Sequence, residues 1–178
     1  MADFEEADES IIMVRKSGPP SLPANRGHDH ERCIAEALET ADALCARRGV
    51  RLTKLRRRVL ELVWTSHAPI GAYDVLRRLS QEHDGAAPPT VYRALDFLLE
   101  QGLIHRIESL NAFVGCADPA EAHASQFLIC QDCGAAAELQ DPAINRALAR
   151  SAGSLGFLVK DKTVELRGLC AQCRESQA

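Results

Sequence analysis

The stretch "PPTVYRALDFLLEQGLIHRIES", residues 88–109, decides the fold. Val91, Leu95 and Leu98 recur at helical spacing, so one face of a helix is apolar. The two prolines favour the first turn of that helix, and Gly102 is suited to end it. The alternating segments "LIHRIE" and "AFVGC" then predict a β-hairpin directly behind the helix.

The residues upstream predict three more helices. The first covers about 31–47, the second begins after Thr53 as N-cap and ends before Pro69, and the third covers about 72–81. Three helices followed by a hairpin are the layout of a winged helix-turn-helix, here with one further helix in front. This predicts a winged-helix domain over 31–115.

The residues after about 118 have a different character. "SQFLIC" and "AAAEL" predict strands, Asp141 and Pro142 begin a helix to about 152, and "GFLVKDKTVELRGLC" predicts two more strands. The predicted fold class is therefore α+β: a winged helix, a hinge at 116–125 and a small α/β domain at 126–178.

The first 30 residues are predicted to be a disordered tail. An acidic start is followed by "KSGPPSLPANRG", which cannot bury enough apolar surface to order itself. The tail contains His28 and His30, a pair that can bind metal but to which we assign no role. Cys33 and Cys45, in the first predicted helix, are interpreted as packing residues.

The composition is that of a soluble globular protein, with 46% hydrophobic and 26% charged residues. No apolar run approaches the length of a membrane span, and the acidic N-terminus lacks a signal-peptide pattern. We expect a cytoplasmic protein with no membrane partner. The net charge of -4 argues against bulk nucleic-acid binding, but "RRGVRLTKLRRR" (47–58) holds seven basic residues and no acidic one. Such a run is either a local phosphate-binding patch or a solvated helix face.

Two Cys-x-x-Cys pairs give the strongest chemical signal. "CQDC" and "CAQC" supply Cys130, Cys133, Cys170 and Cys173, enough for one tetrahedral Zn²⁺. The alternatives are disulfides or thioredoxin-like redox centres. A redox centre needs a single such motif in a strand-to-helix turn, whereas here two pairs occur at predicted strand ends, which favours structural zinc.

A second ligand set is scattered over the hairpin and beyond it. A two-residue turn at 110–111 would place His105 opposite Cys116, on one face of the sheet. His123 follows in the hinge, and Glu138 lies on the strand after the first cysteine pair. These residues predict a site with two nitrogens, one sulfur and one oxygen. The alternative is a polar histidine on a wing, a buried cysteine and a solvated glutamate.

The segments 48–63, 88–109 and 127–139 together resemble the ferric uptake regulator family, and most closely its zinc-sensing branch. The resemblance covers about residues 34–174. It implies a homodimer, with a DNA-binding winged helix followed by an α/β dimerisation domain. It also implies two Zn²⁺ per chain: a structural ion at Cys130, Cys133, Cys170 and Cys173, and a regulatory ion at His105, Cys116, His123 and Glu138.

The resemblance further implies that Tyr73 and Arg93 contact DNA bases. The place of Arg93 near the start of the recognition helix agrees with this role. Tyr92 fits either the core or a phosphate contact, and the basic run would supply phosphate contacts. The predicted DNA-binding residues are Tyr73, Thr90, Tyr92, Arg93, Lys54, Arg56, Arg57 and Arg58.

The function implied is a zinc-responsive transcriptional repressor that binds double-stranded operator DNA and silences zinc-uptake genes. One alternative is a regulator of the same build that senses iron, manganese or peroxide, although the single histidine of "ADPAEAHAS" and the soft ligand Cys116 favour zinc. The other is a thiol redox protein that uses the Cys-x-x-Cys pairs. The sequence contains no evident nucleophile–base pair or phosphate loop, so we do not expect an enzyme.

Overall fold

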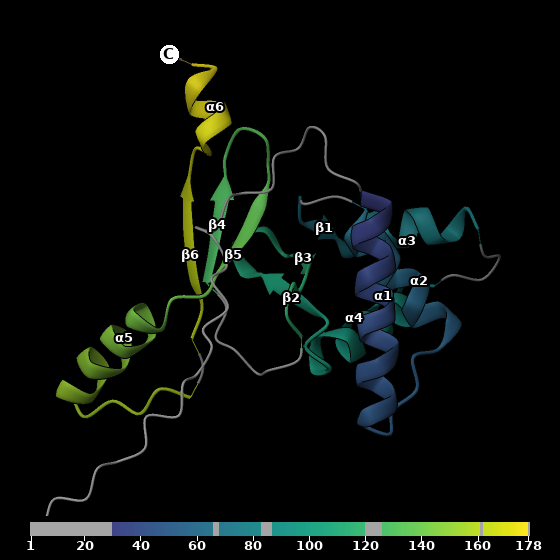
Figure 1. Ribbon diagram of the computed structural model, residues 1–178, viewed down its shortest axis with the longest axis horizontal. Helices are drawn as coiled ribbons and strands as arrows, with labels where there is room; N and C mark the ends of the chain where they lie inside the picture. The colour runs from purple at the N-terminus through teal and green to yellow at the C-terminus, as the bar shows by residue number, and fades with distance from the viewer. Residues whose placement is uncertain (1–29, 66–67, 83–86, 120–125, 161, 178) are drawn as a thin grey trace, which may run out of the picture.

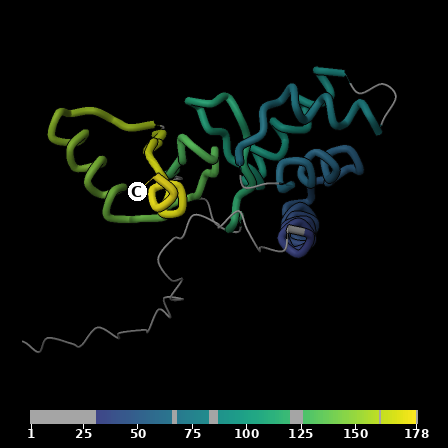
Figure 2. Tube along the Cα trace, turned by 90° about the horizontal axis from the view of Figure 1, so that it is seen from above, coloured from purple at the N-terminus to yellow at the C-terminus, as the bar shows by residue number. Residues whose placement is uncertain are grey.

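The computed structural model describes residues 30–65, 68–82, 87–119, 126–160 and 162–177. They form two lobes, one mostly helical and one built on a sheet, which lie side by side (Figures 1 and 2). The predicted tail, including His28, lies outside the described residues except for His30, whose side chain is not described. Within the described ranges, no helix is long and apolar enough to cross a membrane.

The first lobe has the predicted winged-helix layout. Its elements are α1 (His30–Arg47), α2 (Lys54–Trp64), β1 (Ile70–Gly71), α3 (Ala72–Ser80), α4 (Pro88–Glu100), β2 (Ile104–Ile107), a 3-10 turn (Glu108–Leu110) and β3 (Ala112–Gly115). The four predicted helices are all present, and α2 ends at Trp64, five residues before the predicted break at Pro69. The short strand β1 was not predicted; it pairs with β3 and makes the hairpin a three-stranded sheet.

The apolar stripes of the four helices form the core of this lobe. Val59 of α2, Val75 of α3, and Leu95 and Leu98 of α4 are all buried. Thr53 caps α2 as predicted, because its side chain accepts a hydrogen bond from the Arg56 amide. Cys45 belongs to the same core, which agrees with its interpretation as a packing residue.

The second lobe is the predicted α/β unit. Its elements are β4 (Gln126–Cys130), β5 (Ala136–Leu139), α5 (Pro142–Ser154), β6 (Val164–Gly168) and α6 (Ala171–Glu175). The sheet order is β5-β4-β6, with β4 antiparallel to β5 and parallel to β6. A parallel pair needs a crossover connection, and here α5 lies within it.

The prediction of two strands over 156–170 was half wrong. In the described part of this segment, which leaves out residue 161, only β6 forms, and Phe157, Leu158 and Val159 are irregular and exposed. Their apolar pattern has no neighbouring strand to pair with among the described residues, so the sheet does not extend to them. Helix α6 was also missed; it begins directly after Cys170, whose sulfur caps it.

One row of the second sheet faces the first lobe. Phe127 of β4 stands opposite Glu138 of β5 and Glu165 of β6, so the three side chains leave the sheet on the same face. Phe127 is buried together with Ile107 of the hairpin. The wing therefore packs directly on this sheet, which is how the two lobes come into contact.

Candidate metal centres and DNA-binding surface

The two cysteine pairs meet at the end of the second sheet. Their four sulfur atoms all lie within 4.8 Å of one another. Pairing of β4 with β6 places Cys130 opposite Gly168, two residues before Cys170. The amide of Cys170 donates to Cys130 Sγ at 3.3 Å, and that of Cys173 donates to Cys170 Sγ at 3.4 Å.

The geometry of these sulfurs fits a tetrahedral metal. With metal–sulfur distances of about 2.3 Å, zinc ligands lie about 3.8 Å apart; Cys133 Sγ and Cys170 Sγ are 3.9 Å apart. That is far longer than the roughly 2.05 Å of a disulfide, and all four cysteines are free thiols. The disulfide alternative is therefore not the arrangement seen here.

The protonation of the cluster also fits a cation. Backbone amides, chiefly those of Cys133 and Cys170, lower the pKa of Cys130 to about 6. Its sulfur neighbours, Cys170 first, raise the pKa of Cys173 to about 12. Four thiolates cannot form so close together without a compensating positive charge, which a divalent metal supplies.

Three of the four residues predicted for the second centre are brought together. The ligand atoms of His105, Cys116 and Glu138 lie within 4.8 Å of one another, and His105 Nε2 is 3.3 Å from Glu138 Oε1. His105 comes from β2, Cys116 follows β3, and Glu138 comes from β5 of the other lobe. The site therefore spans both lobes. His123, the fourth predicted ligand, lies outside the described residues.

The predicted register of the hairpin was wrong by two residues. The turn is a 3-10 turn closed by Asn111 at φ 47°, so His105 pairs with Val114 instead of Cys116. A shift of one residue would have turned Cys116 to the other face, but a shift of two keeps the face. Cys116 is thus a diagonal neighbour of His105, and the two side chains still meet.

The surroundings of this centre hold its ligands in place. The Cys116 amide donates to Leu103 O at 3.1 Å, and the ring of His105 lies against Phe127 with 5.5 Å between ring centroids. Burial, with the negative charge of Glu138, raises the pKa of Cys116 to about 12. A cation at this position would favour the thiolate and offset the carboxylate, so the donor set fits a metal.

Sequence reasoning missed two supporting contacts of the hairpin. A Cβ built on Gly115 would lie 2.2 Å from Cε2 of Trp64, so only glycine lets the indole pack beside the strand that leads to Cys116. The backbone of the wing turn is bound by Glu165 of β6. Neither contact carries a local sequence signal, because both join residues from distant parts of the chain.

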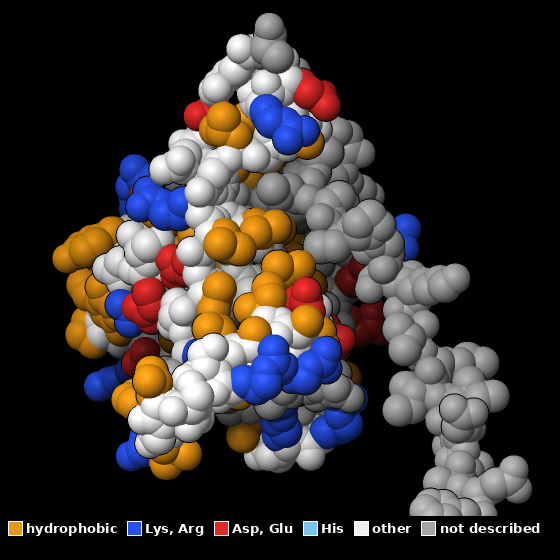
Figure 3. Space-filling model, turned by 90° about the vertical axis from the view of Figure 1, so that its left-hand side faces the viewer, with side chains coloured by type: hydrophobic (Ala, Val, Ile, Leu, Met, Phe, Trp, Pro, Cys, Tyr) orange, Lys and Arg blue, Asp and Glu red, His pale blue; other side chains and the backbone are white. Residues whose placement is uncertain are grey.

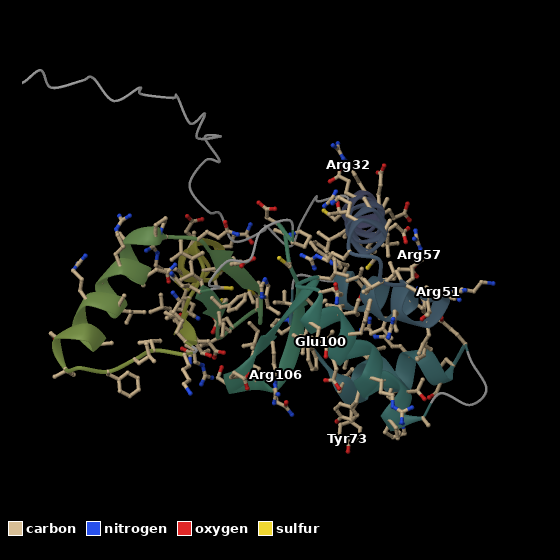
Figure 4. All side chains as sticks on the ribbon, turned by 90° about the horizontal axis from the view of Figure 1, so that it is seen from below. Arg32, Arg51, Arg57, Tyr73, Glu100 and Arg106 are labelled. Atoms are coloured by element: carbon tan, nitrogen blue, oxygen red, sulfur yellow. The ribbon has the colours of Figure 1, made fainter. Side chains whose placement is uncertain are left out.

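The exposed ends of α3 and α4 present the predicted base-contacting residues. The side chain of Tyr73, in the first turn of α3, is 79% exposed and projects from the surface, as Figure 4 shows. Tyr92 and Arg93 of α4 are exposed, and Thr90 is half-buried. This surface is available to a partner, and it carries both hydrogen-bonding and cationic groups.

Most of the basic run has partners within the chain. The guanidinium of Arg56 lies 3.5 Å above the Phe97 ring. Arg57 pairs with Asp42, and Arg58 binds Glu61 and Glu82. Figure 4 shows Arg51 and Arg57 on the α1–α2 side, away from Tyr73.

Lys54, at the start of α2, is exposed. The cationic surface of the run is therefore smaller than the sequence indicates.

Comparison with known proteins shows to which family the chain belongs. The model of the ferric uptake regulator family matches residues 47–167. The chain belongs to this family. It is 42% identical over 144 residues to the zinc uptake regulation protein of Escherichia coli, covering 80% of this chain and 84% of that protein.

Two solved structures share the fold closely. A zinc uptake regulator complexed with zinc and DNA has a TM-score of 0.77 at 41% identity, covering 81% of this chain and 97% of that one. Holo XcZur has a TM-score of 0.72 at 41% identity, covering 79% and 98%. The family resemblance inferred from the three sequence segments is confirmed, as is the α+β fold class with its winged helix.

Proposed function

We propose that this chain is a zinc-responsive transcriptional repressor, whose zinc-loaded homodimer binds operator DNA and represses zinc-uptake genes. The observation that carries this proposal is the meeting of His105, Cys116 and Glu138 from two lobes. A site that needs both lobes can report the presence of a metal as a change in their arrangement. The similarity to proteins that bear zinc in their names, one of them complexed with DNA, supports the same function.

The donor atoms favour zinc over harder metals. One thiolate, one imidazole and one carboxylate, with His123 as the fourth ligand, suit Zn²⁺ better than Fe²⁺ or Mn²⁺, which favour oxygen and nitrogen. The four-cysteine cluster would hold a second, structural Zn²⁺. We therefore propose two Zn²⁺ per chain, one that stabilises the second lobe and one that regulates.

The DNA would lie against the exposed ends of α3 and α4. An arginine at the place of Arg93 can donate two hydrogen bonds to a guanine in the major groove, and Tyr73 would contact bases beside it. Thr90, Tyr92 and Lys54 would contact phosphates and fix the register. Arg56, Arg57 and Arg58 would have to leave their internal partners first, so we expect a smaller contribution from them.

The homodimer would form through the second lobe. Figure 3 shows hydrophobic side chains gathered on this side of the molecule. The exposed large hydrophobic residues of this lobe are Leu148, Leu155, Phe157, Leu158, Val159, Leu166 and Leu169. We call them the apolar surface. Exposed apolar side chains in such number favour an interface, and a second copy of the chain would bury part of them.

Zinc would regulate DNA binding through the site formed by His105, Cys116 and Glu138, because its ligands come from both lobes. When its ligands hold one ion together, the winged helix is fixed relative to the second lobe, and hence to its counterpart in the dimer. Without that constraint only a fraction of molecules present both winged helices correctly, and DNA affinity falls by that fraction. Couplings of this kind amount to about 1–3 kcal/mol.

The test is operator binding in buffered free Zn²⁺, Fe²⁺ and Mn²⁺, with genomic fragments of the source organism as DNA. We expect tight binding with zinc alone, lost in Cys116→Ser and His105→Ala while both variants remain folded dimers. Cys33→Ser, a cysteine outside both centres, is the matched control and should respond as the unmodified chain does. Equal zinc responses in Cys116→Ser and the unmodified chain would refute the regulatory site, and binding driven by iron or manganese would refute zinc sensing.

A further inference from the structure

The turn of the wing is held by a carboxylate from the other lobe. Glu165 of β6 accepts a hydrogen bond from the amide of Glu108 at 2.7 Å and from that of Ser109 at 3.2 Å. These amides begin a 3-10 turn, where backbone N–H groups have no partner within the turn. The contact therefore satisfies two donors at once, and both bonds are charge-assisted.

Glu165 also has a fixed relation to the candidate regulatory centre. Glu165 belongs to the same row of the sheet as Phe127 and Glu138. Phe127 lies on the central strand, with Glu138 on the strand to one side of it and Glu165 on the strand to the other. Neighbouring strands are about 4.8 Å apart, so the two carboxylates leave the sheet about 10 Å apart, on the same face. Glu138 meets His105 at one end of the hairpin's contact, and Glu165 meets the turn at the other.

The apolar contact between these two points does not orient the lobes by itself. Phe127 and Ile107 pack together, but hydrophobic contacts have no preferred direction. A metal centre is one point of attachment, about which the hairpin could still turn. Hydrogen bonds are directional, so a second attachment near the tip of the wing sets the angle between the lobes.

We propose that Glu165 is a positioning residue of the metal switch. It holds the wing in the closed arrangement, in which His105 and Cys116 meet Glu138, before any metal binds. This inference rests on the proposed function, because it treats that centre as the regulatory site. Glu165 does not contact the metal; it acts by raising the fraction of metal-free molecules whose ligands already face one another.

The consequence is a shift in the zinc concentration at which the switch responds. The apparent affinity of a ligand is reduced by the fraction of molecules competent to bind it. The two amides are exposed, and loss of both charge-assisted hydrogen bonds together lowers that fraction by about tenfold. Saturating zinc would still close the molecule, so the final DNA affinity would change little.

The test uses the full chain and two substitutions. Glu165→Gln keeps the shape and one acceptor oxygen but removes the charge, and Glu165→Ala removes both oxygens. Glu39→Gln, on the exposed side of α1, is the matched control. The first measurement is the free Zn²⁺ that gives half-maximal operator binding. We expect it to rise by about tenfold in Glu165→Ala and less in Glu165→Gln, with unchanged binding at saturating zinc.

The second measurement depends neither on DNA nor on zinc at the centre formed by His105, Cys116 and Glu138. Amide hydrogen exchange of Glu108 and Ser109 in protein with zinc only at the cysteine cluster should accelerate in both variants, with exchange in α2 and α4 unchanged. An unmoved zinc midpoint, or unchanged exchange at these two amides, would overturn the proposal. Absence of zinc-dependent DNA binding in the unmodified chain would instead refute the proposed function, while the exchange result would still decide whether Glu165 holds the wing.

Discussion

At the scale of single residues, Gly115 of the wing lies directly against the indole of Trp64 at the end of α2. A methyl group here would overlap Trp64, the only tryptophan of the chain. We predict that Gly115→Ala displaces the indole and lowers the free energy of unfolding by about 1–3 kcal/mol, as overpacking does. Thermal unfolding measures this loss, and tryptophan emission reports the moved ring.

The control for this prediction is Gly153→Ala in α5. Apart from its chain neighbours and the backbone of its own helix, no described atom lies within 4 Å of a Cβ at that position, and the residue is helical. Alanine should therefore stabilise the chain slightly, by about 0.5–1 kcal/mol. An unfolding temperature that falls equally in both variants would contradict the steric account of Gly115.

The candidate ligands were largely predictable at this scale, and for a physical reason. The Cys-x-x-Cys spacing at predicted strand ends is itself typical of a metal site, so these ligands can be identified from the sequence. Side chains alternate between the two faces of a strand, so the predicted register placed His105 and Cys116 on one face. An error of two residues in that register leaves them on the same face. Glu165 could not be found in this way, because its partners are backbone amides, which leave no mark on the sequence.

At the scale of elements, α4 should read the DNA and α2 should anchor it. We predict that Arg93→Ala lowers the affinity for the operator by about 5- to 150-fold, corresponding to about 1–3 kcal/mol. Affinity for unrelated DNA should fall far less. Competition between the operator and a scrambled fragment, titrated at several salt concentrations, measures both.

Lys54→Ala is the comparison for Arg93→Ala. A phosphate contact carries no sequence information, so affinity should fall equally for both DNAs and the salt dependence should weaken by about one ion. If Lys54→Ala lowered specificity as much as Arg93→Ala, the assignment of α4 as the reading element would be wrong.

The elements show where local patterns suffice and where they fail. The four helices of the first lobe follow from their apolar stripes, and Thr53 and Gly102 mark ends that the structure confirms. The strand predicted around Phe157 failed, because a strand needs a partner and the described chain provides none there. The basic run was likewise overestimated, since the acidic partners of Arg57 and Arg58 come from α1 and from the residues after α3 as well as from α2 itself.

At the scale of the whole molecule, the apolar surface should decide the oligomeric state. We predict that Leu158→Asp converts the dimer to a monomer, because two buried charges would face each other across a symmetric interface. Operator affinity would then fall steeply, while both metal centres stay intact within each chain. Sedimentation and metal content measure these outcomes separately.

Ala35→Asp, on the exposed side of α1, adds the same charge away from the apolar surface. It should leave the oligomeric state and operator binding unchanged. A Leu158→Asp chain that still sediments as a dimer would show that the second copy binds elsewhere on the molecule.

The parallel pairing of β4 with β6 has a consequence for how the chain is made. Four helices, which form from local contacts, make up most of the winged helix, whereas the sheet of the second lobe needs Gln126 to find Val164 beyond β5 and α5. Closing a long loop is slow compared with forming helices. In newly synthesised chains the first lobe should therefore fold before the second. Pairing of β4 with β6 in the second lobe also brings Cys170 to Cys130. In a cell starved of zinc, folding of the second lobe would be further delayed, and the unfolded lobe would be exposed to proteolysis. The cellular amount of the protein, and not only its DNA-binding state, would then depend on the zinc supply.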